Sequence, residues 1–509
     1  MRAMRIPVDS VYPDARLFLD YVAGHAVVVE RFQWRVDAVS DAVAARSRGA
    51  YPRDSLRDCL AAYNRGLGAA PSALANAERL ADPSTLCVVG GQQAGFLGGP
   101  AYTAYKIHSI LRVAEGLARS SGRPVVPVFW LATEDHDLNE INRVRVQDDE
   151  GRLATVVFDG EDTGRAIESF SISPAMIAAA DPLIAHLPKE ARQAFRPEPG
   201  DDYATWHARI WSRLFSDQGL VLVEPRTIRP LTEPLCRQAL SRGREIQAAL
   251  ASAAEALGDA GYVAPLDPAQ AGRPFAIDEK GRRVRASGAS VNGDLSPDAA
   301  LRPVLADAVL PSVAQVLGPG EIAYQAMLRP VYELFDVIQP LIVPRQGATV
   351  VSAEDMAMLS HLGVEPSAVV CAGFDMGEAL DRLADPGLAS LFGEVRAGVG
   401  EALSPLAKRV SAIDSGLDAR YRQTAARVDT EIQRLADRAM RADLGRRGIS
   451  VRQARELVER VRPGGKPQER LLSAFELTRR YGLEWLGWLP WDDAIGSGCH
   501  HVVCLEGAE

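Results

Sequence analysis

Apolar positions near residue 90 change from a continuous run to a helical spacing. Residues 84–90 (STLCVVG) form a short run with β-branched residues, bounded by Asp-Pro and Gly-Gly, which is typical of a buried strand. After a glycine-rich loop, apolar residues recur every three or four positions from Ile107 to Leu117, which predicts a helix with one buried stripe. Pro100 is well placed at the first position of that helix, where no backbone donor is needed.

A second apolar run, RPVVPVFWLA at 123–132, completes a predicted βαβ unit and ends in the polar string TEDHDLNEIN at 133–142. Crossovers of this kind are nearly always right-handed and join parallel strands. The loops after the two strands therefore lie at the same edge of the sheet, where open parallel sheets bind ligands. We expect GGQQAGFLGG at 90–99 and TEDHDLNEIN to face one crevice.

The rest of the chain extends this unit and adds a helical region. The first 80 residues read as helical, further strands are predicted at 219–225 and 339–345, and 273–286 reads as a hairpin. Between 388 and 461, apolar residues step by threes and fours among charges, which predicts a long helix with a heptad-like seam.

We therefore predict an α/β fold, with a Rossmann-like parallel-sheet core, inserted connecting segments and a C-terminal helical coiled-coil region. The predicted boundaries are 1–385 for the core with insertions at about 151–300, 386–462 for the coiled coil, and 463–509 for a C-terminal segment that returns to the core.

Composition narrows the class of protein. The 509 residues are 47% hydrophobic and 24% charged, with a formal net charge of −9, so the bulk charge gives no reason to expect a nucleic-acid or membrane surface. We find no apolar run of about 18 residues and no signal-peptide pattern at the N-terminus. Six scattered cysteines fit a reducing cytoplasm. The tail GCHHVVCL at 498–505 matches no common zinc spacing, and we predict a terminal strand there.

The glycine loop is the first candidate for chemistry. Glycines let backbone amides approach a ligand, and a helix N-terminus favours an anion. The run is predicted to be a ligand-facing turn and not a packing device, although a tight turn with no ligand is the alternative. Lys106 could meet a phosphate or simply be solvated. The candidate binding residues here are Gly91, Gln92, Gln93, Gly95, Gly99, Pro100, Tyr102 and Lys106.

Two polar sets are further candidates. Glu134, Asp135, His136 and Asp137 follow a buried strand and could serve acid–base chemistry or bind a metal, although a surface turn rich in acids is the alternative. The second set lies at 318–345, where an arginine could form a fork with a carboxylate or phosphate, or a structural ion pair. Its candidates are Glu321, Tyr324, Arg329 and Arg345, and Asn142 joins the candidates from the first set.

The chain resembles the bacillithiol biosynthesis cysteine-adding enzyme family. The strings that carry the resemblance are GGQQAGFLGGPAYTAYKI, PVVPVFWLATEDHDLNEIN, LRPVLADAVLPSVAQVLGPGEIAYQAMLRPVYELF, PLIVPR and PQERLLSAFELTRRYG, in the family's order. The resemblance implies a Rossmann-type core, a coiled coil that supports a homodimer, and an amide-forming ligase that adds L-cysteine to the amine of glucosaminyl malate. It also implies a distant likeness to class I adenylate-forming ligases, with the Gly99-Pro100 helix start near the place of their HIGH signature.

The chain departs from the family's pattern at two positions. Gly90 stands where many relatives have threonine, and Ala306 where glutamine is frequent. We find no HIGH string and no convincing KMSKS string, which leaves the mode of nucleotide use open.

A carboxylate and an ammonium do not condense unaided in water, so the cysteine carboxylate must first become an adenylate or acyl phosphate. We therefore expect ATP or another nucleotide as cofactor, with no metal, and His136 or a neighbouring carboxylate as the base or as the group that grips an amine. Two alternatives stay open. One is a metal-dependent hydrolase or amidase that uses the Glu134–Asp137 cluster, and the other is a non-enzymatic, nucleotide-binding dimer.

Overall fold

The computed structural model describes residues 1–148, 150–160, 164–286, 293–414, 416–489, 496 and 498–506. Its centre is a five-stranded parallel sheet in the order β11-β10-β2-β3-β6. The chain lays down β2, β3 and β6 toward one side, then returns to place β10 and β11 on the other side of β2. The predicted Rossmann-like parallel sheet is confirmed. Its strands are β2 (Leu86–Gln92), β3 (Val125–Leu131), β6 (Val221–Val223), β10 (Ser312–Leu317) and β11 (Leu341–Pro344).

Helices cover both faces of this sheet, as continuous apolar strands require. Leu86 and Val88 of β2 pack in the same apolar cluster as residues of α6 and α10, whereas Cys87 and Val89 face α4, α5 and α11. The bounds of these helices are α4 (Arg53–Gly66), α5 (Pro71–Arg79), α6 (Tyr102–Ser121), α10 (Tyr203–Leu214) and α11 (Pro225–Ser241).

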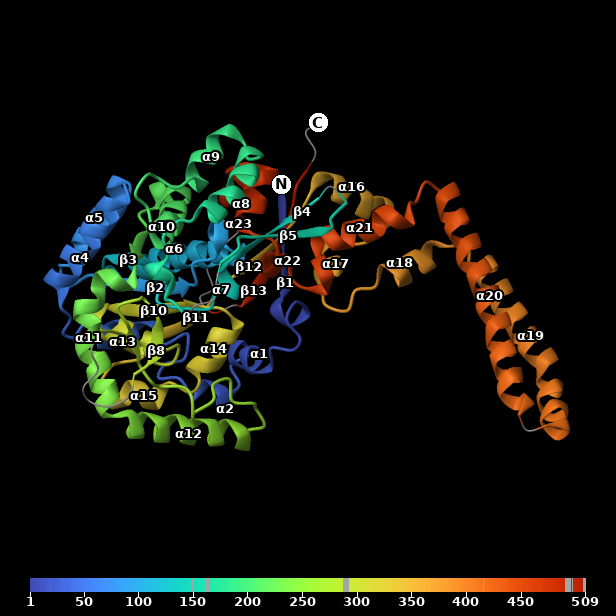
Figure 1. Cartoon of the computed structure of the whole chain (residues 1–509), viewed down its shortest axis with the longest axis horizontal. Coiled ribbons are helices and arrows are strands. Elements are labelled where there is room, and N and C mark those ends of the chain that lie inside the picture. Colours follow the sequence, from blue (N-terminus) through green and yellow to red (C-terminus); the bar gives the residue numbers. More distant parts are fainter. Residues whose placement is uncertain are drawn as a thin grey trace.

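A second sheet joins the two ends of the chain. β13 (Cys499–Cys504) runs antiparallel to β1 (Arg2–Pro7) and parallel to β12 (Gly347–Val351), and the three strands are labelled in Figure 1. The predicted terminal strand is therefore confirmed. The helical interpretation of the first 80 residues is wrong for β1, because pairing with a buried strand decides the conformation of so short a segment.

Two small antiparallel sheets accompany the core. β4 (Arg143–Gln147) pairs with β5 (Leu153–Val157), and β7 (Phe275–Ile277) pairs with both β8 (Arg283–Arg285) and β9 (Asp294–Ser296). The hairpin predicted at 273–286 is confirmed. Residues 161–163 and 287–292 of the predicted insertions, and 490–495, 497 and 507–509 of the predicted C-terminal segment, lie outside the described residues.

A helical arm projects from the body (Figure 1, orange). It consists of α19 (Pro386–Ile413) and α20 (Leu417–Arg446), which lie side by side, followed by α21 (Val451–Val461). The single long helix predicted from the seam is a pair of helices, because Asp414 is extended (φ −156°, ψ 120°) and ends α19. The Arg396–Asp429 ion pair (2.7 Å) ties the two helices together.

The remaining helices complete the body and the base of the arm. None of the helices in the described ranges has the length and apolarity that a bilayer crossing needs. They are α1 (Arg16–Val22), α2 (Ala26–Val29), α3 (Val39–Arg46), α7 (Leu138–Ile141), α8 (Pro174–Ala185), α9 (Lys189–Phe195), α12 (Gly243–Asp259), α13 (Leu301–Val309), α14 (Pro319–Gln325), α15 (Arg329–Leu334), α16 (Ala353–His361), α17 (Pro366–Val370), α18 (Met376–Leu383), α22 (Gln468–Leu471) and α23 (Ala474–Tyr481).

Candidate functional site

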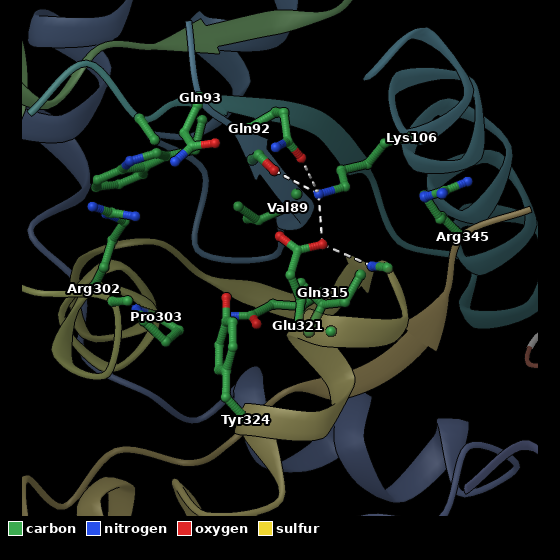
Figure 2. A pocket seen from close by; sticks show the side chains of 18 of the residues that line it. Val89, Gln92, Gln93, Lys106, Arg302, Pro303, Gln315, Glu321, Tyr324 and Arg345 are labelled. Atoms are coloured by element: carbon green, nitrogen blue, oxygen red, sulfur yellow. Dashed lines mark hydrogen bonds and ion pairs between the residues drawn. The ribbon is translucent and has the colours of Figure 1, made fainter. Parts of the chain in front are cut away.

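A cavity of about 380 Å³ lies at the carboxyl ends of β2 and β10 (Figure 2). These strands are neighbours in the sheet, but the chain leaves them in opposite directions, so the cavity occupies the switch point where open α/β sheets bind ligands. We call it the main cavity. Among its lining residues are Val89, Gly90, Gly91, Gln92, Gln93, Tyr102, Lys106, Trp130, Asp135, Arg302, Gln315, Leu317, Glu321, Tyr324, Arg345 and Arg470.

Gly90 and Gly91 belong to β2 and not to the loop that follows it. A Cβ on Gly90 would lie 2.8 Å from the Val316 carbonyl oxygen and 2.8 Å from Cδ1 of Ile110, and one on Gly91 would lie 2.9 Å from the Trp130 carbonyl oxygen. The prediction that these glycines form a ligand-facing turn, and do not serve close packing, is therefore wrong at these two positions. Both glycines also line the main cavity, so close packing and access to the cavity coincide.

The turn itself lies further on, at residues 95–99. Leu97 (φ 50°), Gly98 (φ 90°) and Gly99 (φ 70°) are left-handed, and Gly95 and Gly99 approach each other too closely for a side chain on Gly95. α6 begins at Tyr102, two residues after the predicted start, because Pro100 forms a bridge with Ser473. Gly95, Gly99 and Pro100 line a second cavity of about 330 Å³, which shares Gln92, Gln93, Tyr102 and Arg470 with the main cavity.

Lys106 is buried at the wall of the main cavity and is not solvated. Its Nζ donates to the Gly91 carbonyl oxygen (2.7 Å), to Oε1 of Gln92 (2.9 Å) and to Oε2 of Glu321 (2.6 Å). Burial lowers the pKa of Lys106, and Glu321 partly offsets this effect. Oε2 of Glu321 also accepts from the Gly318 amide (2.7 Å), so the Glu321 carboxylate is held in place at the start of α14.

The two loops predicted to share a crevice do meet. Nε2 of Gln93 donates to Oδ2 of Asp135 (3.1 Å), and both residues line the main cavity. Oδ1 of Asp135 accepts from the His136 amide (2.8 Å) and lies 3.5 Å from Nη1 of Arg283. Burial by itself would raise the pKa of Asp135, but the bond with His136 and the charge of Arg302 hold that pKa well below its usual range. Asp135 is therefore an anion near neutral pH.

The rest of the acidic string diverges from Asp135. Glu134 is buried and pairs with Nε of Arg302 (2.9 Å), whereas Asp137 is exposed and caps α7 by accepting from the Asn139 amide (3.0 Å). Nδ1 of His136 lies 3.5 Å from Oδ1 of Asp135, and 39% of the His136 side chain is exposed.

Neither His136 nor Asn142 lines the main or the second cavity, and Asn142 is buried, with Oδ1 accepting from Nε of Arg143 (3.2 Å). Among the described residues, no three His, Cys, Asp or Glu side chains could hold a metal ion together. The described part of the chain therefore offers the metal-dependent hydrolase alternative no ligand set.

The opposite wall of the main cavity combines predicted and unpredicted residues. Tyr324 lines it, and Arg345 pairs with Glu469 (2.7 Å) in a buried ion pair while lying 5.4 Å over the Tyr102 ring. Arg329 instead pairs with Glu333 (3.1 Å) and does not line the main or the second cavity.

Sequence reasoning missed Gln315 because β10 went unrecognised. It missed Arg302 on α13 and Arg470 on α22 because only the tertiary structure brings these helices to the main cavity. The available signal for β10 was the β-branched run SVAQVL followed by Gly-Pro-Gly, which repeats the pattern of β2.

The fold and the cavity define a Rossmann-like α/β protein with a ligand-sized cavity at the switch point of its sheet and a projecting helical arm. The model of the family described as "Bacillithiol biosynthesis BshC, N-terminal Rossmann-like domain" matches residues 1–292 and 285–346, and that of "Bacillithiol biosynthesis BshC, C-terminal coiled-coil domain" matches 348–504. The chain belongs to the BshC family of bacillithiol biosynthesis, and the resemblance found in the sequence is confirmed.

Relatives extend this match over the full length. The protein named "Putative cysteine ligase BshC" of Geobacillus kaustophilus (strain HTA426) is 31% identical, over 99% of this chain and 100% of the relative. Proteins of the same name from Geobacillus thermodenitrificans (strain NG80-2) and Salinibacter ruber (strain DSM 13855 / M31) are 30% and 29% identical, over 99% and 97% of this chain and 100% and 96% of the relatives.

Proposed function

We propose that this chain is an amide-forming ligase that adds L-cysteine to the amine of glucosaminyl malate and so forms bacillithiol. Its family and the name of its relatives support a cysteine ligase. The observation that carries the finer proposal is that two carboxylates, Asp135 and Glu321, line one cavity at the switch point of the sheet. Both proposed substrates carry an amine, and each carboxylate can bind one as its ammonium.

Each carboxylate is held by a neighbour from another element. Gln93, at the end of β2, donates to Asp135, and Lys106 of α6 donates to Glu321. Because these partners fix the carboxylates before a ligand arrives, the substrates would lose little further free energy in ordering the site. Lys106 therefore acts as a positioning residue in this proposal.

The chemistry requires that the attacking amine lose its proton. The amine nitrogen bonds to the activated carboxyl carbon of cysteine, the bond from that carbon to the leaving oxygen breaks, and the proton passes to a base. Asp135 is a poor base because its pKa is held well below the usual range. We assign the base to His136, which does not itself line the main cavity but whose Nδ1 lies 3.5 Å from Oδ1 of Asp135, a carboxylate that does.

ATP or another nucleotide would supply the leaving group for the cysteine carboxylate. The main cavity has apolar surfaces from Val89, Trp130 and Leu317, which suit a nucleobase. Beside them lies the guanidinium of Arg302, which suits a phosphate. The residues present therefore fit such a cosubstrate.

We expect the carboxylate and histidine variants to separate binding from proton transfer. Asp135→Asn removes the ammonium partner and should lower kcat/KM by about 100-fold or more, since an interaction with a charged group is lost. His136→Ala should lower kcat by about 10²- to 10⁴-fold, the usual contribution of a general base. The assay supplies purified full-length protein with L-cysteine, glucosaminyl malate and ATP, and measures the amide product by mass spectrometry.

Glu333→Gln is the matched control, because Glu333 is an exposed carboxylate paired with Arg329 and should leave the rate unchanged. Wild-type turnover by either variant would contradict these roles. Deletion of the gene tests the function itself: accumulation of glucosaminyl malate supports the ligase, and its absence favours the non-enzymatic nucleotide-binding dimer.

A further inference from the structure

The second cavity contains an unusual concentration of positive charge. It lies between the 95–99 turn, β4 and α22, and three arginines line it. Glu140 is the single carboxylate among its described lining residues, so two positive charges are in excess. The arginines are Arg143, Arg145 and Arg470.

No ion pair involves any of these three arginines in the part of the chain that the structure describes. Neighbouring arginines differ, since Arg152 pairs with Asp148 (2.7 Å) and Arg480 with Glu476 (2.6 Å). Among the described residues, the one hydrogen bond donated by these three guanidinium groups runs from Nε of Arg143 to a neutral amide oxygen, that of Asn142. In a chain of net charge −9, three guanidinium groups that have no carboxylate partner within the described ranges, gathered at one cavity, indicate a site for an anion.

The backbone holds two of these arginines on one face of a strand. Val144, between them, is buried in the core, so Arg143 and Arg145 project from the opposite face, about 7 Å apart along β4. The Ser473 hydroxyl donates to the Arg145 carbonyl oxygen (3.1 Å), which fixes β4 against the start of α23. Separate guanidinium groups at fixed spacing suit a ligand with two separate carboxylates.

We propose that the second cavity is a subsite for a small dicarboxylate carried by the substrate whose amine lies in the main cavity. The two cavities share Gln92, Gln93, Tyr102 and Arg470, so one molecule can reach from one into the other. Two excess positive charges match a dianion better than they match a triphosphate. This inference rests on the proposed function, in which the malate group of glucosaminyl malate is that dicarboxylate.

Direct binding tests the subsite without any ligation. L-malate is titrated into the full-length protein by calorimetry, with malate diamide as the neutral analogue and pyrophosphate as the competing oxyanion. We expect saturable binding of malate, none of the diamide, and an affinity about 10- to 100-fold lower in Arg143→Gln and Arg145→Gln, since each loses a charge-assisted hydrogen bond. Arg152→Gln, on the same hairpin but paired with Asp148, should bind malate as the wild type does.

Absent malate binding, binding that survives in both variants, or pyrophosphate binding in place of malate would each overturn the proposal. Arg470→Gln gives a second measurement, because Arg470 is exposed and its loss should not impair folding. In the ligase assay this variant should raise KM for glucosaminyl malate about 10-fold or more and leave KM for cysteine unchanged. If the protein binds malate but makes no amide, the ligase proposal is refuted and the subsite proposal is not. If the arginine variants are active with an unchanged KM for glucosaminyl malate, the subsite proposal is refuted and the ligase proposal is not.

Discussion

Gly90 occupies a strand position where, given the neighbours present in this chain, any side chain would displace them, although many relatives have threonine there. One side of it meets the carbonyl oxygen of Val316 on β10, and the other meets the Ile110 side chain of α6. The absence of a side chain thus lets α6 and β10 close around the end of β2. That approach brings Lys106 of α6 within hydrogen-bonding distance of Glu321 at the start of α14.

We expect Gly90→Ala to destabilise the protein by about 1 to 3 kcal/mol, because the new methyl group would overlap a backbone oxygen that cannot rotate away. Gly116→Ala is the control: Gly116 lies within α6 with nothing near its missing Cβ, and alanine there should be neutral or stabilising by up to about 1 kcal/mol. Thermal unfolding of both variants measures the difference. Equal midpoints for the two would show that the Gly90 contact relaxes freely.

At the scale of elements, α10 is joined to the 95–99 turn by a hydrogen bond from the His207 ring to the Gly95 carbonyl oxygen. Nε2 of His207 accepts from Nε1 of Trp211 (3.0 Å), and since tryptophan can only donate, Nδ1 carries the proton and donates to the Gly95 carbonyl oxygen (3.1 Å). The neutral ring therefore satisfies both partners. A second proton would remove the acceptor for Trp211.

Burial lowers the pKa of His207 to about 4, although its bond to Gly95 opposes this shift. In the unfolded chain the His207 imidazole titrates near pH 6.5. Between pH 6.5 and 4 the unfolded state therefore binds a proton that the folded state does not. The contribution of neutral His207 to the free energy of unfolding is complete above pH 6.5. It is lost as the pH falls toward 4, by up to about 3 kcal/mol. We expect His207→Gln, which cannot take up the proton, to show a smaller fall of the thermal midpoint from pH 7 to pH 5.

Buried His108 and His500 have pKa values lowered in the same way, to about 4, so part of the fall should persist in His207→Gln. His25, which is largely exposed, gives the control variant His25→Gln. A variant with the same acid sensitivity as the wild type would contradict the role given to His207.

At the scale of the whole molecule, the helical arm exposes more apolar side chains than its packing within one chain accounts for. No residue of α19 is buried among those described, and the arm leaves large apolar side chains in solvent. We propose that a second copy covers this surface, in keeping with the homodimer that the family resemblance implies. The exposed residues on the arm are Leu391, Val395, Leu406, Ile413 and Leu435.

We expect the full-length protein to be a dimer in solution and the double variant Leu391→Glu/Leu406→Glu to be a monomer, since two buried charges would cost the interface several kcal/mol. Val263→Glu is the control, because Val263 is an exposed apolar residue on the body. Light scattering coupled to gel filtration measures the mass of each. A wild-type monomer, or a double variant that remains dimeric, would refute this arrangement.

Sequence periodicity was a reliable guide where a segment carried its own signal. The run at 84–90 and the stripe from Ile107 to Leu117 predicted β2 and α6, since apolar strands and helices buried in a core differ in period. Their exact ends were missed. β2 continues to Gln92 because glycines there are packed in the sheet, and β10 was not recognised, which hid Gln315 from the candidate site.

The amino-acid sequence by itself determined the βαβ unit, the meeting of the two polar loops at one sheet edge, and the family. These follow from local periodicity, from the handedness of crossovers and from strings of residues that lie close together in the chain. Only the tertiary structure decided which polar groups are already paired, because partners such as Lys106 and Glu321 lie 215 residues apart. It also placed Glu134 in a buried ion pair with Arg302 but Asp135 at the wall of the main cavity, and it brought Arg145 and Arg470 to the second cavity.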